Sequence, residues 1–258
     1  MDLNKKTYLL ITGASRGIGR TMAIECSKKI APGSLVVLLA RSESGLNKTK
    51  DQISSNNKSI IVRTIPIDLA NAQKSELQKA ILTSLEGYNA KDFERALIIH
   101  NAGSLGDSTK LAKELDDIDY WVDYYKLNVF SVTVLNAVFM KEFQDIEKVV
   151  VNITSLCGIQ PFPSLSYYCS GKASREMYFK VLASEEPNVV VLNYSPGPVD
   201  TEMFHEIQTN SHDENLRSSF TEQLEKRTVL TTEQTTAKFL SVLEANKFKS
   251  GDHVDYFD

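Results

Sequence analysis

The side chains best suited to chemistry lie between Ser155 and Lys172. Ser155 follows an apolar run at residues 149–153, and a loop containing prolines leads to Tyr168 and Lys172 at the start of an expected helix. Side chains four positions apart project from the same face of a helix. An ammonium group beside a tyrosine favours the phenolate and lowers the pKa toward neutral pH, so the pair is a candidate proton donor. Because this spacing also occurs by chance on helix surfaces, other motifs must support the interpretation.

The elements that must position these side chains alternate regularly. Runs of strand length, rich in Val, Ile and Leu, occur at residues 8–11, 35–39, 60–65, 96–99, 149–153 and 189–194. Helix-like stretches occur between them, at residues 18–29, 46–55, 75–86 and 118–143. We therefore expect residues 1–258 to form a single-domain α/β fold, a doubly wound, Rossmann-like parallel sheet with helices on both faces. The polar segment 206–227 is either a mobile lid or a solvated helical excursion.

Composition restricts the classes of partner. The 258 residues are 42% hydrophobic and 24% charged, with a net charge of −4 and no basic stripe. This argues against nucleic acid and membrane surfaces and favours small-molecule partners. The first apolar run is too short for a signal peptide, and no run approaches the length of a membrane span. Cys26, Cys157 and Cys169 follow no metal-ligand spacing and suit a reducing compartment, so we expect a cytoplasmic protein without a metal.

A glycine cluster, TGASRGIG at residues 12–19, joins the first expected strand to the first expected helix. Small residues let the backbone approach a pyrophosphate, and the start of the helix offers unpaired N–H groups to the phosphates. A tight turn alone would also explain the glycines, but their position between strand and helix favours dinucleotide binding. The candidate cofactor-binding residues in this loop are Gly13, Ser15, Arg16, Gly17, Ile18 and Gly19.

The end of the second strand distinguishes between the two nicotinamide dinucleotides. An NAD site usually has an acidic residue there that bonds the ribose 2′-hydroxyl, whereas this strand ends in Arg41 and Ser42. Arg16 supplies a second guanidinium group nearby, and guanidinium groups match the charge and geometry of a 2′-phosphate. The pattern therefore favours NADPH or NADP+, with two solvated surface charges as the alternative.

Later strands are followed by further candidates for cofactor contact. An aspartate after the third strand can bond the adenine amino group or simply cap a helix. Small residues after the fourth strand let the chain pass close to a cofactor. An asparagine inside the long helical stretch either bonds the backbone, binds a water or lies on the surface. These positions are Asp68, Leu69, Asn101, Ala102, Gly103 and Asn128.

Together the motifs resemble the short-chain dehydrogenase/reductase family over nearly the whole chain. The resemblance rests on their order and spacing, including the PGPVDT stretch at residues 196–201. It implies that Tyr168 donates a proton, that Ser155 orients a substrate carbonyl, and that Lys172 lowers the pKa of the tyrosine and holds the nicotinamide ribose. It also implies a water relay supported by Asn128, and a homodimer formed through the long helices. The residues implied to position the nicotinamide carboxamide are Pro196, Gly197, Val199 and Thr201.

A closer resemblance is to a branch of this family that uses NADPH to reduce side-chain carbonyls of pterins in tetrahydrobiopterin synthesis. It rests on the stretches at residues 152–162, 168–172, 192–198 and 248–258. The last stretch separates this branch from other members, and its aspartate, Asp255, is implied to anchor the pterin. A carboxylate can accept both parallel N–H donors of the pterin edge. The other implied substrate contacts are Ser155, Tyr168, Gly197 and Met203. Cys157, Tyr167 and Met203 are candidates to line the substrate pocket, and packing in the core explains these three side chains equally well.

We therefore expect NADPH-dependent reduction of a pterin side-chain carbonyl. The alternatives are an NADPH-dependent carbonyl or diketone reductase of broader substrate range, and a non-catalytic NADPH-binding regulator on the same fold. The presence of Ser155, Tyr168 and Lys172 argues against the regulator, because a protein that only binds NADPH needs no proton donor beside the nicotinamide.

Overall fold

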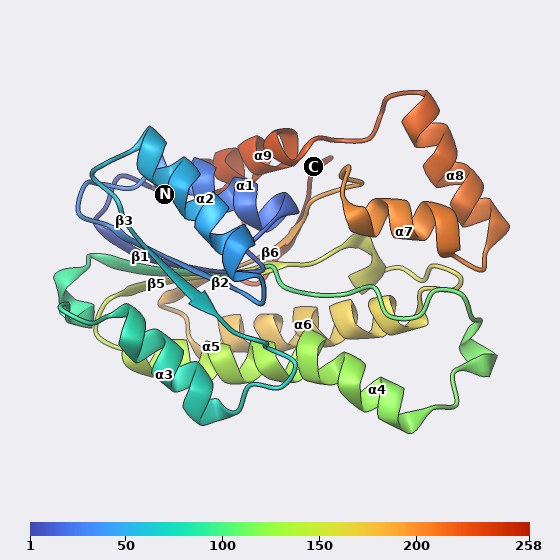
Figure 1. The fold of residues 1–258 in the computed structure, drawn as a ribbon, viewed down its shortest axis with the longest axis horizontal. Helices are drawn as coiled ribbons and strands as arrows, with labels where there is room; N and C mark the ends of the chain where they lie inside the picture. The colour runs from blue at the N-terminus through green and yellow to red at the C-terminus, as the bar shows by residue number, and fades with distance from the viewer.

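The sheet has seven parallel strands in the order β3-β2-β1-β4-β5-β6-β7 (Figure 1). The computed structural model describes all 258 residues. The strands are β1 (Thr7–Thr12), β2 (Leu35–Ala40), β3 (Ile61–Pro66), β4 (Arg95–His100), β5 (Glu147–Ile153), β6 (Val189–Ser195) and β7 (His253–Asp255). The first six agree with the predicted strands to within one or two residues at each end. The expected doubly wound parallel sheet is confirmed.

Helices cover both faces of this sheet. On one face lie α1 (Gly17–Ser27), α2 (Glu43–Asn56) and α9 (Thr232–Ala245), and on the other lie α3 (Lys74–Ser84), α4 (Ile118–Tyr125), α5 (Ser131–Glu142) and α6 (Ser166–Glu185) (Figure 1). Side chains alternate along each strand, so Leu9 and Ile11 of β1 pack into one core while Tyr8 and Leu10 pack into the other. The two cores contain 25 and 21 buried residues, so neither face of the sheet is open to solvent.

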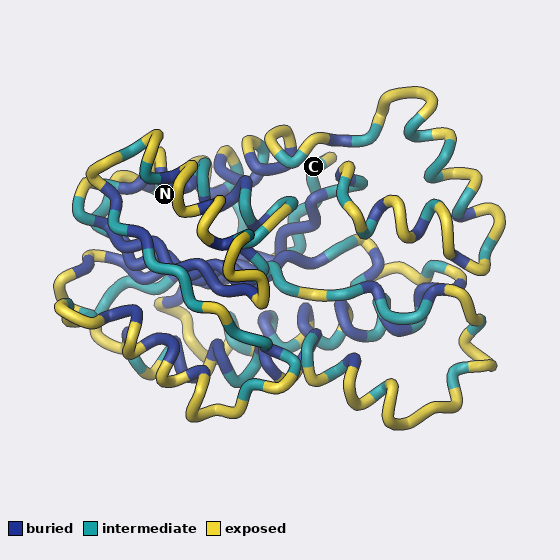
Figure 2. The backbone as a smooth tube through the Cα atoms, viewed as in Figure 1, coloured by how far each residue is buried: buried dark blue, intermediate teal, exposed yellow.

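Two segments differ from the expectation, and for residues 206–227 the helical alternative is confirmed. The stretch predicted as one helix over 118–143 is interrupted by a π-helical turn, Lys126–Phe130, between α4 and α5. Most of the segment 206–227 forms two helices, α7 (Glu202–Asn210) and α8 (Glu214–Glu225), beyond the carboxyl ends of the strands. Figure 2 shows α8 with much of its surface exposed and the central strands of the sheet buried. The short strand β7 was not predicted, because three residues are too few to form a recognisable apolar run.

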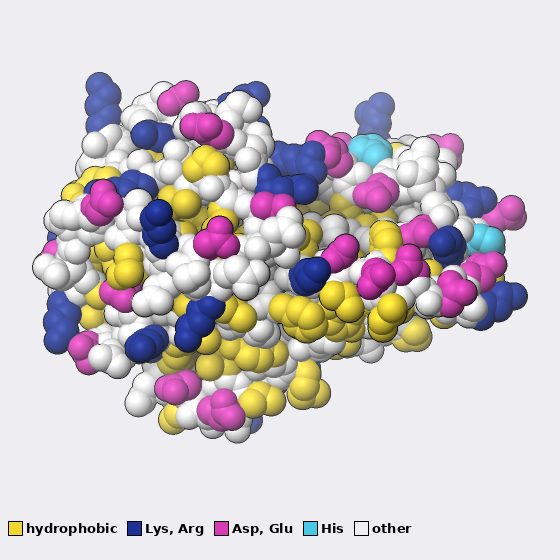
Figure 3. Space-filling model, turned by 60° about the horizontal axis from the view of Figure 1, so that its bottom comes forward, with side chains coloured by type: hydrophobic (Ala, Val, Ile, Leu, Met, Phe, Trp, Pro, Cys, Tyr) yellow, Lys and Arg dark blue, Asp and Glu magenta, His cyan; other side chains and the backbone are white.

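The helical face formed by α3 to α6 carries exposed apolar side chains. Figure 3, which turns the lower side of Figure 1 toward the viewer, shows hydrophobic groups gathered on it. Phe130, Met177 and Val181 are exposed on this side of the molecule, as is Ile118 of α4. No helix of the protein has the length and apolar character needed to cross a membrane.

Candidate active site

Ser155, Tyr168 and Lys172 come together at the carboxyl ends of the central strands. Ser155 follows β5, and its hydroxyl accepts a hydrogen bond from the Cys157 backbone N–H at 3.2 Å. Tyr168 lies in the first turn of α6, and Lys172 follows one turn later. The Lys172 ammonium donates to the Ile153 carbonyl at 2.7 Å and lies 5.3 Å from the centre of the Tyr168 ring. The end of β5 and the start of α6 therefore hold the three side chains as one group.

The protonation of this group differs from the prediction. Burial raises the pKa of the Tyr168 phenol, and the Cys157 thiol raises it further, while the Ser155 hydroxyl and the Arg175 guanidinium lower it. Lys172 was expected to lower the pKa of Tyr168 toward neutral pH, and in this arrangement that expectation is wrong, because burial dominates and the ammonium is bonded to a carbonyl. Burial also lowers the pKa of Lys172. A phenol with a raised pKa keeps its proton at neutral pH, as a proton donor in a reduction must.

Arg175 was not singled out from the sequence. It is 1% exposed, and none of the ion pairs in the protein involves it. Its guanidinium donates to the carbonyls of His100 at 2.6 Å and Ala102 at 3.0 Å and to Asn152 Oδ1 at 2.9 Å. Burial lowers its pKa to about 10. The available signal was its position on α6, seven residues after Tyr168 and thus on the same helix face.

Asn128 lies in the π-helical turn and is 3% exposed. Its Oδ1 accepts from the Ser104 N–H at 2.8 Å, and its Nδ2 donates to the Tyr124 carbonyl at 2.8 Å and to Ser104 Oγ at 3.0 Å. Of the alternatives for this asparagine, the structure supports the backbone bond. A Cβ on Gly103 would lie 3.0 Å from Asn128 Oδ1, so this glycine permits the close approach. Asn128 therefore fixes the loop after β4.

The glycine loop packs directly against that same loop. A Cβ on Gly19 would lie 2.4 Å from Asn101 Nδ2, and one on Gly13 would lie 2.8 Å from it. Gly13 and Gly19 thus allow the close approach of Asn101, whereas the sequence analysis predicted that these glycines allow the approach of a pyrophosphate. Thr12, also missed from the sequence, joins the two loops, because its hydroxyl accepts from the N–H groups of Asn101 and Ala102, both at 3.0 Å.

The start of α1 fits the phosphates of a dinucleotide. Gly17 has φ of +54°, and a Cβ there would meet only the Thr201 methyl group, at 3.7 Å. The residue before the helix, Arg16, makes no side-chain cap, and the first turn contains no acidic residue. The N–H groups of this turn are therefore free to bond an anion. Ser15 and Ile18 are half-buried beside them.

The two candidate cations for a 2′-phosphate lie in different environments. Arg16 is exposed and forms an ion pair with Glu202 at the start of α7. Arg41 is exposed and belongs to none of the ion pairs of the protein. Ser42 caps α2, with its Oγ accepting from the Gly45 N–H at 3.1 Å. Exposed ion pairs contribute about 0–1 kcal/mol, so a phosphate can replace Glu202 as the partner of Arg16.

Asp68 and Leu69 form the turn after β3. The Asp68 carboxylate accepts from the Ala70 N–H at 3.2 Å and from Asn71 Nδ2 at 2.8 Å, so it stabilises this turn. It is not the helix cap considered as an alternative, because α3 is capped by Gln73. Leu69 is buried in the core on the α3 side of the sheet.

The loop after β6 is held from several directions. Gly197 has φ of +72°, where a glycine is favoured, and a Cβ there would lie 3.0 Å from Leu230. Val199 is buried and forms a bridge to Leu230. The Pro196 carbonyl accepts from the Thr235 hydroxyl at 2.8 Å, and Thr201 caps α7. The loop therefore has a defined shape where the resemblance implies contact with the nicotinamide.

Asp255 ends β7 directly beside this loop. In the strand register Asp255 is opposite Ser195, the last residue of β6. Its Oδ1 accepts from the Phe257 N–H at 3.1 Å, while Oδ2 takes part in none of the protein's hydrogen bonds. Asp255 therefore lies at the carboxyl ends of the strands, as do the residues that follow β5 and β6, and one of its carboxylate oxygens is free for a ligand.

The remaining wall of the site is apolar. A small buried cluster contains Leu105, Cys157, Leu165, Ile207 and Leu216. Met203 and Tyr168 pack against it, together with Phe162, Cys169 and Phe220. Helices α7 and α8 thus supply apolar side chains next to Tyr168, and the packing expected as one alternative for Met203 is confirmed.

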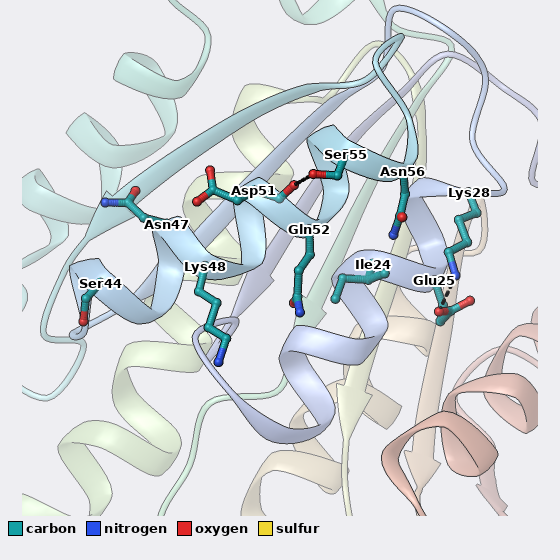
Figure 4. Close-up of a pocket in the computed structure, with 10 residues that line it drawn as sticks. All are labelled: Ile24, Glu25, Lys28, Ser44, Asn47, Lys48, Asp51, Gln52, Ser55 and Asn56. Atoms are coloured by element: carbon teal, nitrogen blue, oxygen red, sulfur yellow. Dashed lines mark hydrogen bonds and ion pairs between the residues drawn. The ribbon is translucent and has the colours of Figure 1, made fainter.

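A groove on the outside of α1 and α2 contains none of the predicted site residues. Figure 4 shows it lined by polar side chains from both helices, including Lys48 and Asp51, with Ile24 as the one hydrophobic residue. It is wide and open, and no groups converge in it that would orient a ligand.

Known proteins resemble this chain in sequence and in fold. The model of the family described as short chain dehydrogenase matches residues 7–212. The sepiapterin reductase of Xenopus tropicalis is 39% identical over 252 residues, covering 96% of this chain and 95% of the relative. The sepiapterin reductase of Bos taurus is 36% identical over 256 residues, covering 98% and 95%. A benzil reductase of Bacillus subtilis, described as (S)-benzoin forming, is 29% identical over 209 residues, covering 78% of each chain.

Solved structures have the same fold. A short-chain dehydrogenase/reductase from Saccharomyces cerevisiae superposes with a TM-score of 0.80 at 25% identity, covering 98% of this chain and 96% of the other. A short-chain dehydrogenase from Shigella flexneri 2a, solved in complex with NADP, has a TM-score of 0.80 at 23% identity and covers 100% and 99%. This chain is a homologue of sepiapterin reductases and an oxidoreductase, and it belongs to the short-chain dehydrogenase/reductase family.

Proposed function

We propose that the protein reduces a ketone carbonyl in the side chain of a pterin, as in tetrahydrobiopterin synthesis, with NADPH as the reductant. The observation that carries this proposal is the register of β7, in which Asp255 is opposite Ser195. Both residues lie at the carboxyl ends of their strands, and Tyr168 lies at this same end of the sheet. A carboxylate there can accept the paired N–H donors of a pterin ring. The sepiapterin reductases named above support the proposal, because each matches almost the whole chain.

Each residue of the site has a role in this reaction. NADPH, when bound, supplies the hydride. Tyr168 donates its proton to the carbonyl oxygen, and the Ser155 hydroxyl bonds the same oxygen and orients it. Lys172, next to the phenol, contributes positive charge as the phenolate forms. Asn128 keeps the loop after β4 in place beside the cofactor and supports the return of a proton to Tyr168 through water.

NADPH is preferred over NADH in this proposal because no acidic side chain follows β2. Arg41 is exposed and unpaired there, and Arg16 has only an exposed ion pair to give up. Guanidinium groups bind a 2′-phosphate through charge-assisted bonds, whereas they gain little from a ribose hydroxyl. The short-chain dehydrogenase from Shigella flexneri 2a, which has the same fold and was solved with NADP, is consistent with this preference.

A second candidate function is the reduction of diketones of several kinds. The relative from Bacillus subtilis is a benzil reductase, and the apolar wall around Met203 suits an aromatic diketone. The two candidates differ at Asp255, which a pterin needs and a diketone lacking N–H donors does not.

We also propose a homodimer formed through exposed apolar side chains of α6 and of the π-helical turn that precedes α5. Phe130 is 50% exposed, Met177 61% and Val181 46%, which is unusual for side chains of this size on a surface without a partner. Replacement of Met177 by Lys is expected to shift the protein toward monomer in sedimentation velocity. A wild-type protein that sediments as a monomer would contradict the proposal.

We propose a cytosolic location as well. All three cysteines are unpaired, and Cys26 and Cys157 are buried as thiols, which suits a reducing compartment. Fractionation of cells that produce the protein tests this.

The function is tested by the loss of NADPH absorbance in the presence of sepiapterin. Wild type should consume NADPH, and Tyr168→Phe should lower the turnover number by roughly 10²–10⁴-fold, the usual contribution of a positioned proton donor. Tyr167→Phe is the control, since that neighbouring phenol is packed among aromatic rings of α4. Unchanged turnover in Tyr168→Phe would contradict the mechanism, and no turnover by the wild type would contradict the pterin assignment.

A further inference from the structure

A buried carboxylate behind the site is unexplained by the reaction. Glu176 of α6 is 1% exposed and accepts three hydrogen bonds. Its Oε2 accepts from Thr154 Oγ1 at 2.9 Å and from His253 Nδ1 at 2.9 Å, and its Oε1 accepts from Lys180 Nζ at 2.8 Å. Burial raises the pKa of Glu176, but these bonds outweigh it and hold the pKa below the ordinary value. Glu176 is therefore a charged acceptor that is used only by the protein itself.

The partners of Glu176 come from three segments that each carry part of the site. Thr154 immediately precedes Ser155, and Glu176 lies one helical turn after Lys172. His253 lies two residues before Asp255 in β7, so it belongs to the strand that ends at the proposed pterin anchor. One carboxylate oxygen thus connects the catalytic serine segment, the catalytic helix and the strand of the anchor.

The strand β7 needs such a connection. It has three residues, lies at the edge of the sheet and pairs only with β6. Short edge strands are held weakly by their backbone bonds alone. The His253–Glu176 bond joins this strand to α6, the helix that also carries Tyr168.

The histidine is suited to this single bond. Its Nδ1 must be the donor, because the Glu176 carboxylate can only accept. Its Nε2 is buried and has no hydrogen-bond partner. A side chain that donates from the Nδ1 position alone would therefore preserve the contact, and asparagine, whose amide nitrogen lies at a similar distance from the backbone, meets this requirement.

We propose that His253 is a positioning residue that acts through Glu176 to set the distance between Asp255 and Tyr168, and so determines the affinity for pterins over simple ketones. This inference rests on the proposed pterin reduction. A carboxylate that is misplaced by about 1 Å loses much of its binding energy for a rigid heterocycle. A diketone does not use Asp255, so its reduction should not depend on the position of β7.

The test compares His253→Leu with His253→Asn, two side chains of similar size of which only the second can donate to Glu176. We expect His253→Leu to raise the KM for sepiapterin roughly ten-fold, with the turnover number and the KM for 2,3-butanedione changed by less than about three-fold. His253→Asn should restore the KM for sepiapterin to near the wild-type value. Thermal melting of each variant is measured in parallel.

A double variant separates positioning from a general loss of structure. If His253 acts through Asp255, His253→Leu should have no further effect on the KM for sepiapterin in an Asp255→Ala background, since the anchor is already absent. Additive effects of the two substitutions would overturn the proposal. Should His253→Leu fail to fold, Glu176→Gln replaces it, because it keeps the volume and one acceptor, and it should raise the KM for sepiapterin and leave that for butanedione unchanged.

The remaining outcomes are distinct. An equal rise in KM for both substrates, or a His253→Asn protein no better than His253→Leu, overturns the positioning role while the proposed function stands. A wild-type protein that does not reduce sepiapterin overturns the proposed function, and this inference with it.

Discussion

Asp255→Asn tests the pterin anchor with the smallest possible change in shape. Its Oδ1 is shared with the Phe257 N–H at 3.1 Å, and its Oδ2 is free, so the carboxylate has acceptor capacity for a ligand. The amide keeps one acceptor but presents an N–H group where the pterin also presents one. The substitution therefore removes one charge-assisted bond, worth about 1.5–3 kcal/mol, and introduces two facing donors.

The expected effect on affinity follows from this bond. A loss of about 1.5–3 kcal/mol corresponds to roughly 10- to 150-fold in a binding constant. Asp255 is only half-buried, so we expect the lower part of this range, a rise of about 10- to 30-fold in the KM for sepiapterin. Turnover at saturation should change little, because Tyr168 and Ser155 are untouched.

The assay is steady-state NADPH oxidation with sepiapterin and, separately, with 2,3-butanedione. Glu186→Gln, which neutralises an exposed carboxylate at the other end of α6, is the control for the loss of one charge. An Asp255→Asn protein whose KM for sepiapterin stays within about two-fold of the wild type would refute the reasoning. An equal rise for butanedione would refute it too, since that substrate offers no N–H donor.

Three further predictions concern the cofactor, a thiol and acid stability. Arg41→Ala should raise the KM for NADPH by roughly ten-fold and leave that for NADH unchanged, and equal effects on both would remove Arg41 from the phosphate site. The Cys157 thiol beside it lowers the pKa of Cys169 below its ordinary value, while burial raises that of Cys26. Iodoacetamide should therefore label Cys169 before Cys26, and peptide mass analysis that finds Cys26 labelled first would contradict this. Because the pKa of Glu176 is held below its ordinary 4.5 in the folded protein, its contribution to stability is present above that pH and is lost as the pH falls through the folded-state pKa. The difference in unfolding free energy between wild type and Glu176→Gln should therefore shrink below about pH 4.5, and a difference that is constant from pH 7 to pH 3 would contradict it.

The parts of the fold that were predictable are those in which many residues repeat one pattern. Five strands, β1, β2, β4, β5 and β6, contain continuous apolar runs because they are buried between the two helical layers, and such runs can be recognised in a sequence. β3 lies at the edge of the sheet and is only partly buried, so its apolar run is broken by Arg63 and Thr64. β7 could not be recognised in this way, since three residues carry no periodicity and the strand depends on its register with β6. The interruption at Lys126–Phe130 was likewise hidden, because the apolar pattern continues through the π-helical turn that holds Asn128.

The site residues likewise divide into those that a local sequence pattern identifies and those that depend on distant parts of the chain. Ser155, Tyr168 and Lys172 could be selected because their spacing is local to one strand end and one helix. Arg175 and Glu176 act across the molecule, and their carbonyl, hydroxyl and imidazole partners lie 20 to 80 residues away in the chain. The pKa of Tyr168 depends on burial, which spacing alone does not reveal, and for this reason the predicted direction of its shift was wrong.

The most direct test of the account is the ratio of kcat/KM for sepiapterin to kcat/KM for 2,3-butanedione, measured with NADPH on the wild-type protein. The account predicts a ratio well above one, because only the pterin can engage Asp255 while both carbonyls can reach Tyr168. A ratio at or below one would contradict the pterin site and would favour the diketone reductase in its place.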